Sequence, residues 1–304
     1  MMTDQQWKVG SIVVTKLVEF EAKMPVAGFI KDALVGATAE DVAEIDWLKP
    51  VWLDDEDQMG GGVHSFLIED GDERIIVDTG IGNCKVRTAA HFNKLNTDFL
   101  DRLEAFGWHP RTVTKVICTH LHVDHVGWNT VLLGDEWVPT FANAEYVFVS
   151  SEFDHWRTYA STPGADQSYD TQWARDMVDG VSVFEDSVKP VWEAGLVRLV
   201  AADDTIHEGI RLVPSPGHTP GHASVMIESG GESAVISGDM MHCVLQVARP
   251  DWSSVLDTDR ALAHQTRERL LGEWADHSIL LLGTHFGSPT GGYLVKHESS
   301  FRLE

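Results

Sequence analysis

The chain has 304 residues with 47 acidic and 23 basic side chains, which gives a formal net charge of −24. So acidic a chain is a poor match for nucleic acid, because that affinity rests on lysine and arginine neutralising phosphates. The length suits one large α/β domain, and no low-complexity stretch, internal repeat or proline-rich linker marks a boundary.

The three cysteines, Cys84, Cys118 and Cys243, are widely spaced and odd in number, so they predict neither a disulfide framework nor a Cys-x-x-Cys pair. The first residues lack the basic and apolar regions of a signal peptide, and no apolar run approaches a membrane span. We therefore expect a cytoplasmic protein that binds neither membrane nor nucleic acid. Its expected partners are a small-molecule substrate and a second copy of the chain in a homodimer.

The N-terminal part of the chain predicts scaffold elements. Residues 9–20 alternate as a strand or hairpin does. Thr38 begins a run with the composition of a capped helix start. The glycines at 60–62 open a strand towards Ile68 and predict a turn or a flexible edge. Apolar residues at helical spacing favour a helix over 95–106.

The densest group of metal-capable side chains follows a short apolar strand that ends at Cys118. His120, His122, Asp124 and His125 lie within six residues of one another. A chain that leaves a strand half-extended puts residues i and i+2 on the same side, so His120 and His122 can hold one ion. Asp124 and His125 are aimed elsewhere and can hold a second. Neutral imidazole and carboxylate suit zinc and similar divalent metals.

Three further ligand candidates come later in the chain. His218, Asp239 and His285 each follow an apolar strand and a short turn with a glycine, where a rigid sheet can aim a ligand. Two metals need more ligands than four residues provide, so these three extend the candidate set. A helical region over about 151–191 precedes them, and residues 260–274 predict one amphipathic helix.

Several aromatic and histidine residues have two interpretations. Trp128, Trp156 and Trp252 lie in segments expected to approach a cleft, where aromatic walls would suit an apolar substrate. Equally, tryptophans fill cores and interfaces. His64 begins a strand and is predicted to be a core or edge histidine, and His222 is predicted to be a structural partner near His218.

The run from Thr119 to Gly127 contains the H-x-H-x-D-H signature, and here the chain resembles the metallo-β-lactamase-fold hydrolase superfamily. Segments upstream and downstream match in order and spacing, among them the Asp78-Thr-Gly80 turn and the Pro216–His222 run. The resemblance implies an α/β fold, the four-layer αββα sandwich of the metallo-β-lactamase fold. It implies a single domain over residues 1–304, with an N-terminal extension and a helical insertion at about 151–191 that covers the metal cleft.

The same resemblance implies a complete two-metal site. The superfamily pattern assigns one metal to His120, His122 and His218, the other to Asp124, His125 and His285, and a bridging position to Asp239. The implied cofactors are two divalent ions, zinc first, with a hydroxide between them as the nucleophile. Asp124 would orient the hydroxide and later carry a proton to the leaving group. Asp78 would hold a ligand histidine by its other ring nitrogen.

Two C-terminal segments look like the lactonase and organophosphate-hydrolase branch of the superfamily. They are the run from Gly283 to Gly291 and the stretch from His242 to Trp252, although Gly287 stands where relatives often carry proline. In the lactonases of that branch a tyrosine at about the position of His242 donates a hydrogen bond to the substrate, which implies a catalytic role for His242. An ordinary loop histidine is the alternative. The predicted function is a dinuclear-metal hydrolase of an ester-type bond, in a lactone, an aryl ester or a phosphotriester.

Other classes with this fold stay open. Iron-dependent oxidoreductases include persulfide dioxygenases, which keep fewer ligands, and flavodiiron proteins, which carry a flavin domain that this chain lacks. A glyoxalase-type thioester hydrolase would need a basic patch for its thiol substrate, and the sparse lysine and arginine count against it. A non-catalytic binding protein is disfavoured by the full ligand set.

Overall fold

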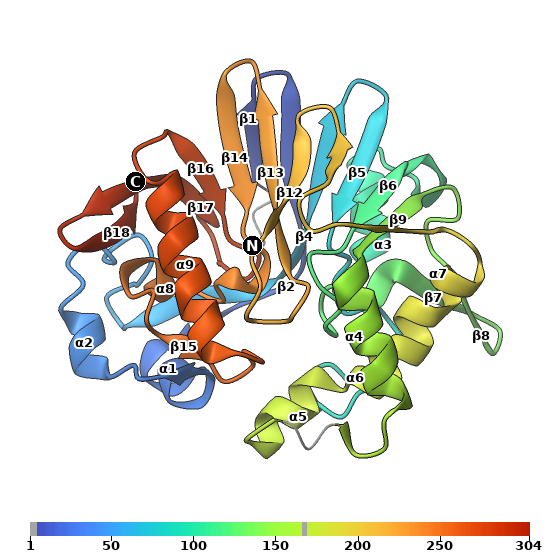
Figure 1. Cartoon of the computed structure of the whole chain (residues 1–304), viewed down its shortest axis with the longest axis horizontal. Helices are drawn as coiled ribbons and strands as arrows, with labels where there is room; N and C mark the ends of the chain where they lie inside the picture. The colour runs from blue at the N-terminus through green and yellow to red at the C-terminus, as the bar shows by residue number, and fades with distance from the viewer. Residues whose placement is uncertain (1–4, 166–168) are drawn as a thin grey trace. The chain divides into compact units, whose positions relative to one another are not determined.

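The computed structural model describes residues 5–165 and 169–304, and Figure 1 shows its course from the N-terminus to the C-terminus. The described chain forms two compact units. Unit 1 comprises Phe20–Gly62 and Ala202–Glu304, and unit 2 comprises residues 5–19 and Val63–Ala201. The organisation as a single domain with a helical insertion stays a prediction, and residues 166–168 of that insertion lie outside the described residues.

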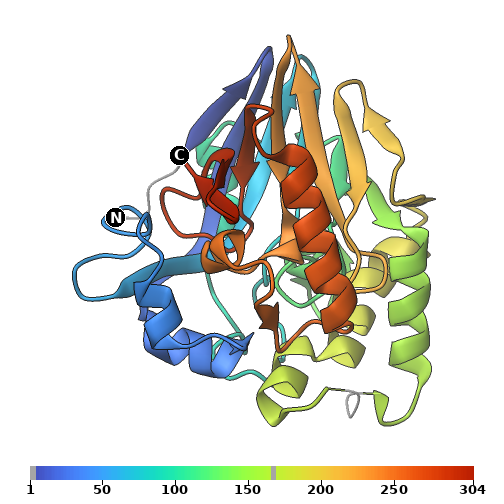
Figure 2. The ribbon, with the colours of Figure 1, turned by 60° about the vertical axis from the view of Figure 1, so that its left-hand side comes forward.

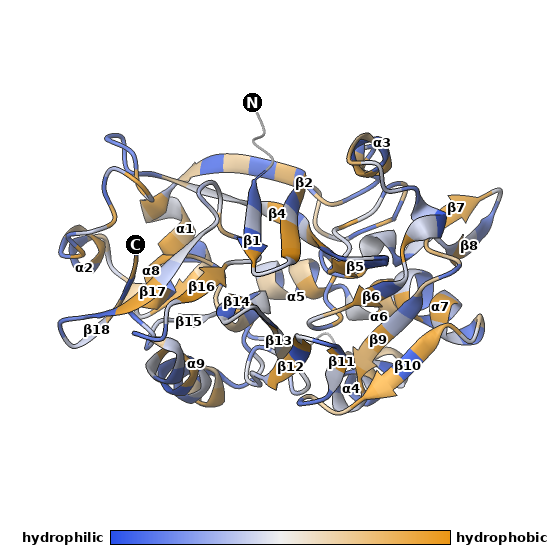
Figure 3. Ribbon diagram, turned by 90° about the horizontal axis from the view of Figure 1, so that it is seen from above, coloured by the Kyte–Doolittle hydropathy of each residue, from blue (hydrophilic) through white to orange (hydrophobic). Residues whose placement is uncertain are grey.

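A seven-stranded sheet forms the framework of unit 2. In spatial order its strands are β1 (Gln6–Val9), β2 (Ile12–Pro25), β4 (Gln58–Asp70), β5 (Glu73–Val77), β6 (Lys115–Ile117), β9 (Glu145–Val149) and β10 (Val197–Val200). The last four strands pair in parallel. Their carboxyl ends therefore meet at one edge, and the segments that follow β5, β6 and β9 come together there. Figure 3 shows hydrophobic colouring over much of β9 and β10, and every residue of β9 after Glu145 is buried.

Helices and a hairpin complete unit 2. They are α3 (Phe99–Ala105), η1 (Pro110–Thr112), η2 (Gly127–Asn129), the hairpin of β7 (Thr130–Leu133) and β8 (Glu136–Pro139), α4 (Ser150–Ser161), α5 (Gln172–Val178), α6 (Gly180–Val183), η4 (Phe184–Val188) and α7 (Lys189–Glu193). Helix α4 directly continues β9 and packs against β9 and β10, and Phe153 of α4 stacks on Phe148 of β9 with the ring centroids 6.5 Å apart. The helical character expected for this part of the chain is therefore present in its described residues.

A second seven-stranded sheet forms the framework of unit 1. In spatial order its strands are β11 (Thr205–His207), β12 (Ile210–Pro214), β13 (Ala223–Ser229), β14 (Glu232–Ile236), β16 (Ile279–Leu282), β17 (Gly291–His297) and β18 (Ser300–Leu303). β14 and β16 pair in parallel, so the residues that follow them share one edge. His218 lies on the connection between the antiparallel strands β12 and β13. This arrangement gathers three predicted ligands of unit 1.

The remaining elements of unit 1 are short, with one exception. They are α1 (Val26–Ala33), the small strand pair β3 (Leu34–Val35) and β15 (Ser253–Ser254), α2 (Ala39–Ala43), η5 (Gly238–Met240), α8 (Leu245–Ala248) and α9 (Arg260–Trp274). Helix α9 has the bounds that the sequence predicted and packs against β17 and η5. Figures 1 and 2 show α9 lying along the second sheet. Thr38 caps α2 by accepting a hydrogen bond from the Asp41 N–H, as expected. No helix in the described part of the chain combines the length and the apolar character needed to cross a membrane.

The prediction of a turn or flexible edge at residues 60–62 is wrong, because these glycines lie inside β4. The backbone approaches them closely on both sides. A Cβ on Gly60 would lie 3.2 Å from Cα of Gly287, and one on Gly62 would lie 2.3 Å from the carbonyl oxygen of Phe20. Glycine is therefore required by packing and not by a turn.

The predicted helix over 95–106 begins later than expected, at Phe99. The Asn83 side chain accepts a hydrogen bond from the Thr97 N–H and donates one to the Thr97 carbonyl. These bonds hold Thr97 outside the helix, and spacing in the sequence gives no sign of them.

Candidate functional site

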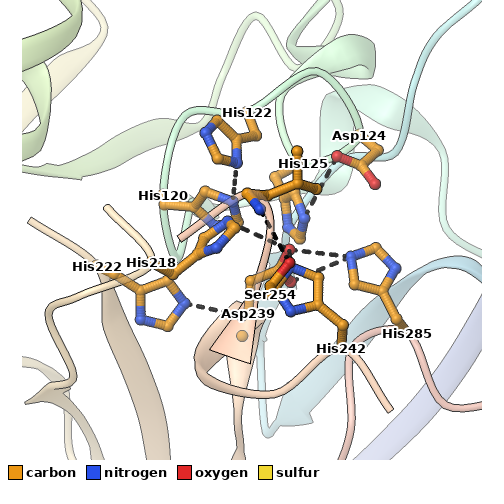
Figure 4. Close-up of polar contacts among 12 residues, drawn as sticks. His120, His122, Asp124, His125, His218, His222, Asp239, His242, Ser254 and His285 are labelled. Atoms are coloured by element: carbon orange, nitrogen blue, oxygen red, sulfur yellow. Dashed lines mark hydrogen bonds and ion pairs between the residues drawn. The ribbon is translucent and has the colours of Figure 1, made fainter. Parts of the chain in front are cut away.

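The predicted ligands form two groups, and each group lies within one unit. The first ligand group, in unit 2, consists of His120, His122, Asp124 and His125 on the turn after β6. Nε2 of His120 lies 3.0 Å from Nδ1 of His122, and Figure 4 shows the two rings facing each other through these atoms. Neutral imidazole has one nitrogen that accepts and one that donates. A proton or a cation between the two nitrogens satisfies both, so this pair fits a metal ligand set.

Asp78 fixes the orientation of His125. Its Oδ2 lies 2.9 Å from Nδ1 of His125, and its carboxylate also accepts from the backbone N–H and the hydroxyl of Thr119. The ring therefore donates through Nδ1, which directs the Nε2 lone pair away from Asp78. Nε2 lies 3.5 Å from Oδ1 of Asp124. The contact between Asp78 and a ligand histidine that the sequence predicted is present.

Helix α4 braces the same turn, a role that the sequence did not reveal. Oε1 of buried Glu152 accepts hydrogen bonds from the backbone N–H of Leu121, at 3.1 Å, and from the indole of Trp156, at 2.7 Å. Leu121 stands between the two histidines of the pair. The Trp156 ring packs edge-on against His122, with the centroids 5.1 Å apart.

Glu19 organises the segments on either side of the first ligand group. Its buried carboxylate accepts from the backbone N–H groups of Ile81 and Gly82 and from the indole of Trp128. Burial raises the pKa of Glu19, and these hydrogen bonds act in the opposite direction. The residue joins the turn after β5 to the segment after His125, so it supports the group without belonging to it.

The second ligand group, in unit 1, consists of His218, Asp239 and His285. Nε2 of His285 lies 3.1 Å from the Asp239 carboxylate, and Nε2 of His218 lies 3.5 Å from it. His242 joins them, since its Nε2 lies 3.3 Å from Oδ2 of the same residue. Figure 4 shows the three imidazoles arranged around this one carboxylate. Such a set of nitrogen and oxygen donors suits a divalent ion of the zinc type.

In both histidines of this group, the ring nitrogen remote from Asp239, Nδ1, makes a hydrogen bond with an oxygen atom. His285 has the carbonyl oxygen of Gly62 at 2.8 Å, and His218 has Oδ1 of Asp257 at 3.2 Å. Each ring therefore donates through Nδ1 and turns its Nε2 lone pair towards Asp239. The glycine-rich part of β4 explains the Gly62 contact, because its backbone lies directly against the segment that carries His285.

Asp257 and its partner Arg267 are functional candidates that sequence reasoning missed. The guanidinium of Arg267 is fully buried and lies 3.4 Å from Oδ2 of Asp257. It also donates to the backbone carbonyls of Pro250 and Met240. Asp257 is 39 residues from His218, and no motif surrounds either member of the buried pair. Only the fold brings them together.

The three tryptophans considered as cleft walls are all buried and have partners inside their own units. Trp128 stacks on Phe99 with the ring centroids 5.3 Å apart, and Trp156 contacts His122. The guanidinium of Arg249 lies over Trp252 at 4.9 Å. A contact of any of these rings with a substrate stays a prediction. His64 is likewise buried, with its ring against Phe66, as predicted for a core histidine.

Comparison with known proteins gives consistent results. A family model described as the metallo-beta-lactamase superfamily matches residues 59–274. An N-acyl homoserine lactonase from Bacillus sp is 23% identical over 186 residues, and the match covers 57% of this chain and 61% of the relative. The chain thus spans less than two thirds of the length of that curated relative.

Two solved structures cover nearly the whole chain. A hydrolase of the beta lactamase superfamily, AbOPH, superposes with a TM-score of 0.79 at 24% identity and covers 100% of this chain and 97% of its own. AidC, described as a dizinc quorum-quenching lactonase, gives a TM-score of 0.77 at 20% identity, with 99% and 96% covered. At these identities the likeness concerns the fold. The predicted α/β fold of the metallo-β-lactamase type is confirmed.

Proposed function

The chain belongs to the metallo-beta-lactamase superfamily, and from this premise we propose that it is a metal-dependent hydrolase of an ester-type bond in a small molecule. One observation carries the proposal. The rings of His285 and His218 are each fixed by a hydrogen bond at Nδ1, and their Nε2 atoms lie 3.1 and 3.5 Å from the Asp239 carboxylate. Rings fixed in this way are the arrangement by which proteins orient histidines towards a metal.

We propose that the two ligand groups together hold two divalent ions, with zinc as the first candidate. His120, His122 and His218 would hold one ion, Asp124, His125 and His285 the other, and Asp239 would contact both. When bound, such ions lower the pKa of a water towards neutrality and polarise a carbonyl or phosphoryl oxygen. Every position of the superfamily pattern is filled by a side chain of the expected chemistry.

The chain's own residues would then supply orientation and proton transfer. Asp78, Asp257 and the carbonyl of Gly62 fix the histidine rings before substrate arrives. Asp124 is only partly buried, so its carboxylate is available to take a proton from the attacking water and to pass it to the leaving oxygen.

His242 is the proposed hydrogen-bond donor to the substrate oxygen. Its backbone N–H donates to the side chain of Gln246, which fixes the start of the loop after Asp239. Its ring lies parallel to that of His285, with the centroids 5.9 Å apart. The same position would also suit a further metal ligand, because Nε2 lies near the Asp239 carboxylate.

The variant His242→Ala distinguishes the two roles. A donor aimed at developing negative charge contributes about 2.7–4 kcal/mol, so its loss slows turnover by roughly two orders of magnitude while both metals stay bound. The effect should be largest for esters with poor leaving groups. Loss of one metal from the variant would assign His242 as a ligand, and unchanged turnover of a poor-leaving-group ester would remove it from catalysis.

The substrate class is tested with a panel on zinc-loaded protein. The panel holds an N-acyl homoserine lactone, an aryl ester and a phosphotriester, and Asp239→Ala serves as the matched inactive control. We expect hydrolysis of at least one ester-type member by the wild type and none by the control. A protein that binds metal yet cleaves no member, and instead consumes oxygen with a persulfide or cleaves a glutathione thioester, belongs to one of the alternative classes.

A further inference from the structure

His222 is buried four residues after His218, and its ring takes part in a series of hydrogen bonds that includes the backbone N–H of Asp239. Its Nε2 lies 2.8 Å from the backbone nitrogen of Asp239, and its Nδ1 lies 2.8 Å from Oγ of Ser215. Figure 4 shows the ring of His222 directed at the Asp239 backbone. The connection between β12 and β13 is therefore tied to the segment that leaves β14.

The direction of every bond in this series is determined by chemistry. A backbone N–H can only donate, so Nε2 of His222 accepts from Asp239 and carries no proton. Nδ1 then carries the proton and donates to Oγ of Ser215. That oxygen also accepts from the Ser224 N–H, so its own proton goes to Oγ of Ser224, 3.0 Å away. The last hydrogen bond of the series is the one that the Ser224 hydroxyl donates to the carbonyl of Ser237, at 2.8 Å.

The series of bonds thus starts and ends on one short segment, since Ser237 and Asp239 are two residues apart. That segment carries the ligand on which three imidazoles converge. Asp239 stands at the non-helical φ of −88° and ψ of 20° inside η5. Its N–H is at the start of a helical turn, where the turn itself offers no acceptor. The ring of His222 supplies the acceptor instead.

We propose that His222 is a positioning residue that fixes the backbone of Asp239, and that it is not a metal ligand. The two histidines of the Pro-Gly-His-Thr-Pro-Gly-His run therefore have different tasks. The Nε2 lone pair of His218 faces the Asp239 carboxylate, whereas Nε2 of His222 accepts a hydrogen bond from the Asp239 N–H. The inference rests on the proposed function only in taking Asp239 as a metal ligand.

The tautomer of His222 is measured directly by NMR on protein with ¹⁵N-labelled histidine, in the metal-free state and after loading with ¹¹³Cd. The signal of His222 is assigned as the one missing from His222→Gln. We expect a protonated Nδ1 and an unprotonated Nε2 in both states, with no coupling to cadmium. An Nε2-protonated ring, or coupling between His222 and cadmium, would overturn the proposal. This experiment uses neither substrate nor turnover, so its outcome is independent of the hydrolase proposal.

A matched pair of variants tests the consequence for Asp239. In His222→Gln the amide oxygen can take the place of Nε2 and accept from Asp239. In His222→Asn the shorter amide reaches only the place of Nδ1 and keeps the bond to Ser215. We expect His222→Asn to weaken the binding of one zinc ion about 10- to 100-fold in competition with a chromogenic chelator. His222→Gln should bind both ions with nearly wild-type affinity.

Near-ultraviolet circular dichroism of both metal-free variants reports whether the fold is kept. Equal zinc affinities for the two variants, whether both normal or both weakened, would contradict the role assigned to Nε2. If the pair differs as expected but neither variant nor the wild type cleaves an ester, the positioning role stands and the hydrolase proposal fails.

Discussion

Glu152 accepts a hydrogen bond of 3.1 Å from the backbone N–H of Leu121, the residue between two predicted metal ligands. The same oxygen accepts the indole N–H of Trp156. Helix α4 thus supports the turn that carries the first ligand group.

The two hydrogen bonds to Oε1 of Glu152 lead us to predict different stabilities for two variants. Glu152→Ala leaves two buried N–H groups without their acceptor, which costs about 1–3 kcal/mol for each group left unsatisfied. Glu152→Gln can keep an amide oxygen in the same place and should be much closer to wild type. Urea unfolding of the metal-free proteins measures the difference, and an alanine variant as stable as the glutamine variant would contradict it.

Asp78 should matter for metal affinity more than for global stability of the loaded protein. Asp78→Ala removes the acceptor from Nδ1 of His125 and frees the ring to turn, so zinc binding should weaken about 10- to 100-fold. Asp78→Asn is the matched control. Its single amide oxygen can accept from either His125 or Thr119 but not from both, so its zinc affinity should lie between those of the wild type and Asp78→Ala. Competition with a chelator measures the zinc affinities of the three proteins. An Asp78→Ala variant that binds zinc as tightly as the wild type would refute the prediction.

Arg267 is predicted to be essential for the stability of unit 1. Burial raises the pKa of Asp257 and the charge of Arg267 lowers it, so the carboxylate depends on its partner. Arg267→Met leaves a buried charge without compensation, and the expected loss is about 3–5 kcal/mol of unfolding free energy. The double variant Arg267→Met with Asp257→Asn removes that charge and should regain part of the loss. A double variant no more stable than the single one would show that the pairing is not the cause.

Because of Lys85, we predict that the free energy of unfolding depends on pH in the alkaline range. Its ammonium is buried, 2.8 Å from Oγ1 of Thr130 and 3.8 Å from the ring centroid of Trp137, and burial lowers its pKa from 10.5 to about 8. Between these values the unfolded chain holds a proton that the folded chain has released. Unfolding free energy should therefore rise with pH across this window, by about 3 kcal/mol in total from this group.

The variant Lys85→Met isolates that contribution. It lacks the titrating group, so the difference between wild type and variant should change with pH between about 8 and 10.5 and stay flat below it. Urea unfolding at several pH values measures this difference. A difference that falls with rising pH in this window would mean that the sign is wrong.

The sequence predicted the parts of the structure that depend on neighbours in the chain. Thr38 caps its helix and Arg260–Trp274 forms one helix because caps and apolar spacing act within a few residues. The candidate ligands His120, His122, Asp124 and His125 could be proposed for the same reason, because they are neighbours in the chain. The contact of Asp78 with His125, 47 residues apart, was expected only through resemblance to a known family.

What could not be predicted depends on distant backbone and on ring orientation. The glycines at 60–62 suggested a turn, yet they are needed because the Gly287 backbone lies against Gly60 and the Phe20 backbone lies against Gly62. Asp257 and Arg267 carry no local signature, since their pairing exists only after α9 has packed. The separate tasks of His218 and His222 follow from which nitrogen meets which partner, and residue spacing does not encode that.

The central claim is that the two ligand groups hold two metal ions that the hydrolysis requires. Elemental analysis of zinc-reconstituted, fully active protein tests it most directly, with Asp239→Ala beside it. We expect two zinc ions per chain in the wild type, and both a lower zinc content and no ester hydrolysis in Asp239→Ala, because this carboxylate would contact both ions. Full activity with a single bound ion per chain would contradict the claim.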